Sequence, residues 1–309
     1  MELSPHGLPM IDLRSNLNDL VSQVETAMRE FGSFYVRNHA IDPELIDLTF
    51  ADFRAFFAQP IEYKFRYLLS KNHLRGYIPF ETQNVNAYMG RPNFPNDPVE
   101  RFVCGPRNSS DVPKNVYPSI PPSLTNNVQN YYTSFQNLSH SLMNIFSMIL
   151  NPTDPNYFSR NCNHGQHIMK ANFYPALKTS EVAQSHRFPE HTDSNLFTIL
   201  ATDSCAKSLM VQKNDGQWVY GDPVAGAVFV NAGHVLQLLT NGHWKATVHK
   251  VAWSDETCVP DRLSVAYFVV MNSEAVIECL DGCKKNGETP NFEVMTYGEY
   301  YRRTNREAY

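Results

Sequence analysis

A succession of short segments rich in β-branched and aromatic residues occupies the second half of this 309-residue chain. Polar turn sequences separate them, among them Asn214-Asp215-Gly216 and Asn241-Gly242. We predict strands at residues 167–174, 196–200, 209–212, 218–220, 227–231, 246–253, 263–271 and 275–278. Many short strands at regular spacing are typical of double-sheet architectures. The pattern therefore predicts a mainly β chain with flanking helices around a double-stranded β-helix (jelly-roll) core.

The N-terminal part of the chain has helical periodicity instead. Ser15 precedes apolar positions that recur at helical spacing as far as Phe31, and Gly32 is suited to end that helix. Asp42 followed by Pro43 is typical of a helix start, because a side-chain acceptor then precedes a residue whose φ is already helical. We therefore predict two helices here, the second with an apolar, phenylalanine-rich inner face.

Further segments complete the predicted organisation. A strand is expected at residues 34–36, loops with short strands at 74–118, a long helix at 122–150 and a last helix at 297–306. We expect an N-terminal region, residues 1–120, to pack on a catalytic core, residues 121–309, as one compact unit.

Composition narrows the class of protein. Apolar residues make up 42% of the chain, and its net charge of -5 provides no broad basic surface for nucleic acid or for an anionic membrane. The start of the sequence does not resemble a signal peptide, and no apolar run is long enough to span a bilayer. The six cysteines form no CxxC pair, which favours free thiols. We expect a cytoplasmic monomer that binds neither nucleic acid nor a membrane.

A candidate metal site begins with His191 and Asp193. In a strand, residues two apart point to the same face, so both side chains could reach one ion. Imidazole nitrogen with carboxylate oxygen suits Fe(II), and a second histidine would complete the facial triad that leaves coordination positions open. His249, within a strand-like segment, is the candidate. Taken alone, a His-x-Asp sequence occurs often by chance.

A candidate anion site lies further along the chain. Arg262 and Ser264 are also two apart on an apolar strand and face the same way. An arginine that points into a small barrel is costly unless it meets an anion. A carboxylate cosubstrate could provide that anion, and an ion pair with a protein carboxylate at the barrel rim is the alternative.

Several separated motifs resemble the Fe(II)- and 2-oxoglutarate-dependent dioxygenases of the isopenicillin N synthase-like superfamily. The resemblance rests on residues 231–251, on the order His191-x-Asp193, His249, Arg262-x-Ser264, and on residues 8–13, 31–39 and 56–64. It covers nearly the whole chain.

The resemblance assigns roles to individual residues. It implies that His191, Asp193 and His249 hold the iron and that Arg262 and Ser264 bind 2-oxoglutarate. It also places Asn172 and Tyr174 beside the cosubstrate, with a purely structural core tyrosine as the alternative for Tyr174.

The sequence departs from the family's pattern at several positions. His234 stands where the family has a structural aspartate, so it is not expected to be a ligand. Asn195 replaces a common glycine, and we expect it to tolerate a left-handed backbone there. Ser33 and Ala40 also replace glycines.

The resemblance implies a reaction that consumes O2 and 2-oxoglutarate and releases succinate and CO2, with ascorbate as a suitable reductant in vitro. A C–H bond of the substrate would be oxidised by hydroxylation, desaturation or ring closure. Two alternatives stay open: an Fe(II) oxidase on the same scaffold that needs no 2-oxoglutarate, and a jelly-roll binding protein without catalysis.

The substrate is the least defined part of the prediction. Arg75 and Tyr77 lie in the loop-rich region, where the penicillin-forming relatives place an arginine against a substrate carboxylate. A solvated loop arginine is the alternative. If Arg75 binds substrate, we expect a small anionic compound, for example an amino-acid derivative of secondary metabolism.

Overall fold

The computed structural model describes residues 1–69, 74–88, 90–91, 93–106, 114–150, 154, 156–163, 166–178, 186–203, 207–253, 258–284, 290 and 292–304. Its helices are α1 (Leu17–Glu30), α2 (Pro43–Phe57), α3 (Ile61–Lys64), α4 (Val85–Tyr88), α5 (Leu124–Leu150), α6 (Tyr157–Asn161), α7 (His234–Leu239) and α8 (Tyr297–Thr304), with short 3-10 turns at Phe65–Tyr67 and Asp281–Cys283. Among these residues, no helix combines the length and the apolar character needed to cross a bilayer.

The strands form two principal sheets. The larger has nine strands in the order β1-β2-β3-β12-β9-β15-β6-β5-β4, and the smaller has four in the order β11-β10-β13-β8. Their bounds are β1 (Glu2–Leu3), β2 (Pro9–Asp12), β3 (Ser33–Arg37), β4 (Gly76–Ile78), β5 (Glu100–Cys104), β6 (Ile168–Tyr174), β8 (His186–His191), β9 (Phe197–Thr202), β10 (Leu209–Gln212), β11 (Trp218–Tyr220), β12 (Ala227–Ala232), β13 (His249–Ala252) and β15 (Arg262–Val269). Two further pairs are β7 (Leu177–Lys178) with β14 (Cys258–Val259), and β16 (Val276–Ile277) with β17 (Met295–Thr296).

Side chains alternate across the large sheet. On its central strand β15, Leu263, Val265 and Tyr267 are fully buried in the main apolar core, whereas Arg262 and Ser264 face a cavity. Strands β6, β9 and β12 alternate in the same way, because successive residues of a strand point to opposite faces. One face of the sheet is therefore apolar and the other carries polar groups.

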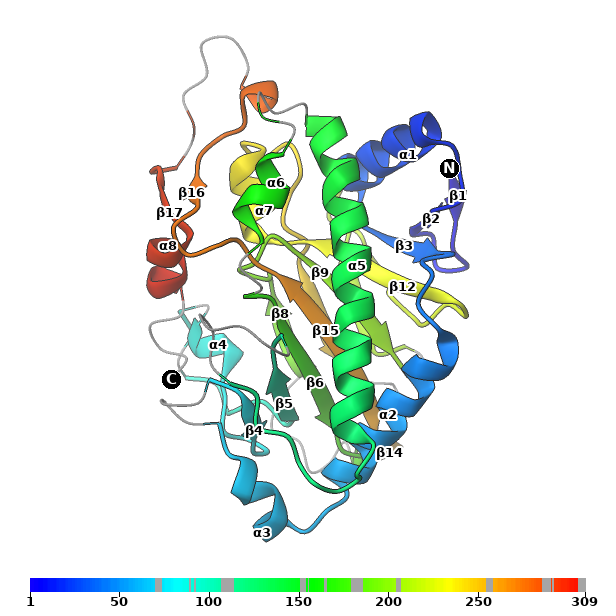
Figure 1. Ribbon diagram of the computed structural model, residues 1–309, viewed down its shortest axis with the longest axis vertical. Helices are drawn as coiled ribbons and strands as arrows, with labels where there is room; N and C mark the ends of the chain where they lie inside the picture. The colour runs from blue at the N-terminus through cyan, green and yellow to red at the C-terminus, as the bar shows by residue number, and fades with distance from the viewer. Residues whose placement is uncertain are drawn as a thin grey trace.

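The N-terminal helices and α5 cover the apolar face. Figure 1 shows α5 crossing the sheet lengthwise, with α1 and α2 beside it. Phenylalanines of α2 dominate the contact, and Phe57 stacks on Phe173 of β6 with ring centroids 5.2 Å apart. The predicted inner face of the second helix is confirmed, with Leu45 and Ile46 only partly buried at its edge.

The cavity lies between the two sheets. Its lining combines residues of β5, β6, β9, β12 and β15 with residues of β8, β10 and β13. The mainly β fold with flanking helices is thereby confirmed as a double-stranded β-helix. Strand β2 pairs with β3, and β3 pairs with β12. Strand β5 pairs with β6. The N-terminal residues thus extend the sheet that carries the cavity.

Several predicted elements differ in detail. Asn16, not Ser15, caps α1, because its side-chain oxygen accepts the backbone N–H of Asp19 at 3.0 Å. Helix α7 was not predicted, and Asn241-Gly242 follows that helix rather than closing a hairpin. Asn214-Asp215-Gly216 does connect two paired strands, β10 and β11. The predicted end of the last helix, Arg306, lies outside the described residues.

The N-cap yields a stability prediction. Asn16→Ala should lower the free energy of unfolding by about 1 kcal/mol, because it removes a cap acceptor. Ser15→Ala is the matched control and should change little, since the Ser15 side chain caps nothing. Urea unfolding of both variants measures the difference. Equal destabilisation by the two substitutions would contradict the assignment of the cap.

Candidate metal centre

Three side chains from two neighbouring strands and a loop converge at one end of the small sheet. His191 and His249 are direct partners in the β8–β13 register. Their Nε2 atoms lie 3.9 Å and 3.8 Å from Oδ1 of Asp193. Among the described histidines, cysteines and acids, these are the residues whose ligand atoms come together, all within 4.8 Å of one another.

Backbone carbonyls orient both imidazole rings. Nδ1 of His191 lies 2.9 Å from the carbonyl oxygen of Pro189, and Nδ1 of His249 lies 3.0 Å from that of Thr247. A carbonyl can only accept, so each Nδ1 carries the proton and each Nε2 keeps a free lone pair. Burial, reinforced by His249, lowers the pKa of His191, which keeps its ring neutral at pH 7.

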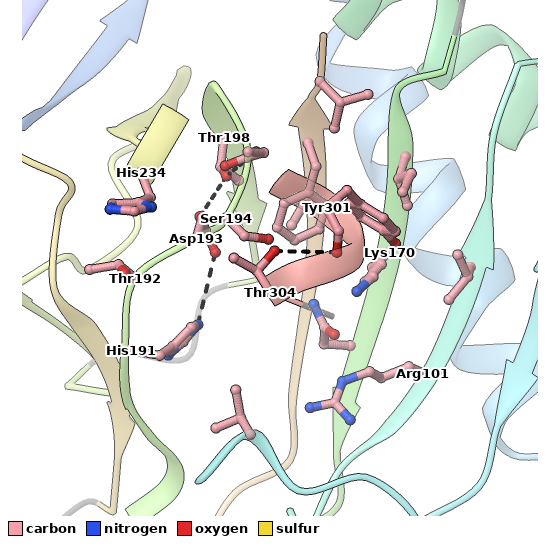
Figure 2. A pocket seen from close by; sticks show the side chains of 18 of the residues that line it. Arg101, Lys170, His191, Thr192, Asp193, Ser194, Thr198, His234, Tyr301 and Thr304 are labelled. Atoms are coloured by element: carbon pink, nitrogen blue, oxygen red, sulfur yellow. Dashed lines mark hydrogen bonds and ion pairs between the residues drawn. The ribbon is translucent and has the colours of Figure 1, made fainter. Parts of the chain in front are cut away.

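Asp193 is positioned differently from the prediction. Strand β8 ends at His191, so Asp193 lies in the loop beyond it and does not share a strand face with His191. Its Oδ2 instead accepts hydrogen bonds from Thr198 Oγ1 at 2.6 Å (Figure 2) and from Asn231 Nδ2 at 2.9 Å. These two donors are neighbours on β9 and β12, and they leave Oδ1 directed at the histidines.

The ionisation of Asp193 follows from these neighbours. Burial opposes the charged form, but the two histidines and then the hydrogen bonds from Thr198 and Asn231 hold the pKa of the carboxyl below its usual value. Asp193 is therefore an anion with one oxygen committed to the protein and one available to a metal.

The loop around Asp193 is fixed by close backbone packing. A Cβ on Gly233 would collide with the carbonyl group of Asn195, so only glycine fits there. Asn195 does not take up the left-handed backbone that we expected; its side-chain amide instead donates to Thr198 Oγ1 at 3.0 Å. His234 points elsewhere than the other two histidines, with its Nδ1 2.8 Å from the Tyr300 hydroxyl.

The donor set fits a ferrous ion. Two neutral imidazoles and one carboxylate, all with free ligand atoms on the same side, form the arrangement used by non-haem Fe(II) enzymes. Each of the three side chains also has a hydrogen bond to a protein group that orients it as a ligand.

A cavity of about 1230 Å³ joins this cluster to the candidate anion site. Arg262 is 2% exposed and donates from Nη1 to the Ser264 hydroxyl at 3.1 Å, while its Nε has no hydrogen-bond partner. No carboxylate among the described residues pairs with it. A buried guanidinium in this state requires an anion from outside the protein.

Asn172 and Tyr174 border the same site. They are the direct partners of Ser264 and Arg262 on the neighbouring strand β6, and both line the cavity. The guanidinium carbon of Arg262 lies 5.3 Å from the centre of the Tyr174 ring, which supports a cation–π contact.

The two predicted substrate residues separate. Arg75 lines the cavity and is 5% exposed, so it is not a solvated loop residue. Tyr77 does not line the cavity: its side chain is fully buried in the core, and its hydroxyl donates to Glu100 at 2.6 Å. The prediction that Tyr77 contacts substrate is wrong because β4 turns that residue inward.

Sequence reasoning missed several polar residues of this cavity. Four of them belong to strands of the large sheet: Thr198, Asn231, Arg101 and Lys170. A detectable pattern was present for Lys170, since it stands two residues before Asn172 and therefore on the same strand face. Nothing local identified Thr198, because only the fold brings it to Asp193.

Comparison with known proteins agrees with this arrangement. Residues 8–138 match the model of the non-haem dioxygenase in morphine synthesis N-terminal region, and residues 165–270 match that of the 2OG-Fe(II) oxygenase superfamily. Azadirone synthase LFS of Melia azedarach is 28% identical over 99% of this chain and 94% of its own length. Homoarginine-6-hydroxylase 2-ODD-233 of Oryza sativa subsp. japonica is 25% identical over 94% of this chain and 91% of its own.

Solved structures are similar over most of the chain. JOX2 in complex with 2OG, Fe and JA is 26% identical with a TM-score of 0.80, covering 96% of this chain and 84% of that one. A full-length Neurospora crassa protein, solved in complex with alpha-KG and thymine, is 25% identical with a TM-score of 0.84, covering 100% of this chain and 99% of that one.

The chain belongs to the 2OG-Fe(II) oxygenase superfamily. It is a dioxygenase that uses Fe(II) and 2-oxoglutarate to oxidise a small molecule. The two alternatives, an oxidase that needs no 2-oxoglutarate and a binding protein without catalysis, are not favoured by these relatives.

The support of Asp193 yields a prediction. Thr198→Val should weaken Fe(II) binding by about 10–100-fold, because it removes a hydrogen bond that orients a ligand. Thr202→Val, in the same strand but without a bond to Asp193, is the control. Anaerobic Fe(II) titration measures both, and equal affinities would show that the carboxylate needs no such support.

Proposed function

We propose that His191, Asp193 and His249 hold Fe(II), and that Arg262 and Ser264 bind the distal carboxylate of 2-oxoglutarate. The observation that carries this proposal is one cavity that contains both a triad of free ligand atoms and a buried arginine without a protein anion. Asn172 and the Tyr174 hydroxyl lie beside that arginine and complete the cosubstrate site in this proposal.

The protein's contribution to the reaction is to bind and orient. When bound, Fe(II) with 2-oxoglutarate and O2 supplies the oxidant that takes a hydrogen atom from a substrate C–H bond, with succinate and CO2 as products. His191, Asp193 and His249 would hold the ion through three ligand atoms that lie within 4.8 Å of one another. Arg262 would bind the distal carboxylate of the cosubstrate through bidentate hydrogen bonds. Apolar side chains such as Leu200, Phe229 and Val251 line the same cavity and keep water away.

Arg75 is the proposed contact for an anionic substrate, such as an amino-acid-derived metabolite. Its Nε is buried without a hydrogen-bond partner, and its Nη1 donates to the carbonyl of Leu74 at 2.9 Å. Hydroxylation, desaturation and ring closure are all compatible with such a substrate.

We propose further that the enzyme is a cytoplasmic monomer of secondary metabolism, with residues 1–120 packed on residues 121–309. Cys104, Cys162 and Cys283 are buried free thiols, which suits a reducing compartment. The pairing of β3 with β12 and of β5 with β6 supports one compact unit. The net charge of -5 gives no reason to expect nucleic acid as a partner.

The metal assignment predicts which histidines matter. His191→Ala, Asp193→Ala and His249→Ala should each lose Fe(II) binding and succinate formation while the protein stays folded, because each removes one of three ligands. His234→Gln is the control, since this histidine lines the cavity but bonds to Tyr300. Iron content and succinate release under Fe(II), ascorbate and O2 are the measurements. Full activity in any of the three alanine variants would overturn the assignment.

The cosubstrate assignment predicts graded effects. Arg262→Ala should raise the apparent KM for 2-oxoglutarate strongly, since a buried carboxylate without its charge partner costs about 2–5 kcal/mol. Ser264→Ala should cost only about 0.5–1.5 kcal/mol, the value of one hydrogen bond. Arg262→Lys should raise the KM by an intermediate factor, because it keeps the positive charge and loses the bidentate geometry of the guanidinium. An unchanged KM in Arg262→Ala would place the cosubstrate carboxylate elsewhere.

A further inference from the structure

Lys170 is a cation of the cavity that the proposed reaction does not use. It projects from β6 into the cavity, across from the loop that carries Asp193 (Figure 2). Its Nζ lies 5.3 Å from the centre of the Phe268 ring on β15. The ammonium donates no hydrogen bond to any residue within the described ranges, although it has three donors to satisfy.

Two arginines stand near Lys170, and they differ in their partners. Arg101 of β5 already has protein partners, because its Nη2 lies 3.3 Å from the buried carboxylate of Asp97 and its Nη1 donates to Gln83. Arg75 has no carboxylate partner among the described residues. Its guanidinium instead packs on Gly105, where a Cβ would lie 2.7 Å from Nε.

The sheet register places Arg75 and Lys170 close to each other. Gly76 pairs with Val103, and Val103 pairs with Lys170 on the other side. Arg75 directly precedes Gly76, so the two cations come from the same level of the sheet with one strand between them. Both side chains line the same cavity.

Within the described part of the chain, no charge compensates these two cations once the iron and the cosubstrate are bound. The positive charges of Fe(II) and Arg262 equal the negative charges of Asp193 and a dianionic 2-oxoglutarate, so that part of the cavity is neutral. Arg101 and Asp97 form a pair of their own. The other charged lining residues, Glu274, Arg302 and Arg303, are exposed at the rim, where water screens them.

We propose that Lys170 and Arg75 together form a binding site for a doubly negative group of the substrate, so that the enzyme acts on small molecules that carry two carboxylates or one phosphate monoester. This inference rests on the proposed function, since it assigns Arg262 to 2-oxoglutarate. It adds Lys170 as a residue that determines substrate specificity, and it defines the substrate class by charge.

The electrostatics of the free cavity agree with this arrangement. Burial, then the positive charge of Arg101, and also that of Arg75, lower the pKa of Lys170 to about 8, against the opposing influence of Asp193. The ammonium is thus held in a position that disfavours its charge. A bound anion removes that penalty, which is a reason for selective affinity toward dianions.

Binding of simple probes tests the proposal without knowledge of the substrate. The full chain is loaded with Zn(II), which cannot perform the redox reaction, and saturated with N-oxalylglycine, an inert analogue that fills the Arg262 site. Isothermal titration then compares four aromatic probes: isophthalate with two carboxylates, phenyl phosphate, singly charged benzoate and neutral benzamide. We expect at least one dianion to bind about 30-fold or more tightly than benzamide, with benzoate between them.

Matched variants assign that preference to residues. Lys170→Met keeps the side-chain length and should reduce the preference for dianions about 10-fold or more, as should Arg75→Met, whereas Lys170→Arg should retain it. Lys213→Met is the control, because Lys213 also lies over an aromatic ring, 5.8 Å from the centre of Phe31, but outside the cavity. Thermal unfolding verifies that every variant is folded.

The outcomes distinguish failure of this anion site from failure of the proposed function on which it rests. Isophthalate and phenyl phosphate distinguish dicarboxylates from phosphate esters as the preferred class. Probes that bind without regard to charge, or a preference that survives Lys170→Met and Arg75→Met, overturn the anion site even if N-oxalylglycine binds normally. Loss of metal-dependent N-oxalylglycine binding in the unmodified chain would instead contradict the proposed function.

Discussion

The polar groups that the large sheet contributes to the cavity depend on the alternation of side chains along its strands. Helices α1, α2 and α5 cover one face of the sheet (Figure 1). The other face bounds the cavity. Leu263, Val265 and Tyr267 therefore stabilise the fold, while Arg262 and Ser264, between them in sequence, reach the cavity. A shift of one residue in the pairing of β15 would exchange the two sets. The apolar core thus fixes the position of the polar site, because burying the one face requires exposing the other to the cavity.

The metal centre joins this sheet to the smaller one. His191 and His249 belong to paired strands of the small sheet, whereas Thr198 and Asn231, which hold Asp193, belong to the large sheet. The relative positions of these three side chains consequently depend on how the two sheets pack together. A carboxylate in a loop would ordinarily be mobile, but two hydrogen bonds from a rigid sheet restrict it, and this preorganisation favours metal binding.

Charge explains how one cavity can bind two different small molecules in distinct places. Arg262 lies beside Tyr174 and Ser264. Lys170 belongs to β6, and Arg75 directly precedes β4. Arg262 and Arg75 are buried and Lys170 is half-buried, and burial makes an unmatched charge costly and a matched one selective.

The amino-acid sequence by itself determined the strand pattern, the helix that begins at Asp42-Pro43, the triad candidates and the pair Arg262 and Ser264. These depend on local periodicity and on spacing within one strand, which the chain carries in its own order. Only the tertiary structure decided that Thr198 and Asn231 orient Asp193, that Tyr77 turns into the core and that Lys170 stands near Arg75. Apart from the contact of Thr198 with Asp193, these contacts join residues that lie far apart in the chain. They arise because hydrogen-bonded strands bring distant segments to the same level of a sheet.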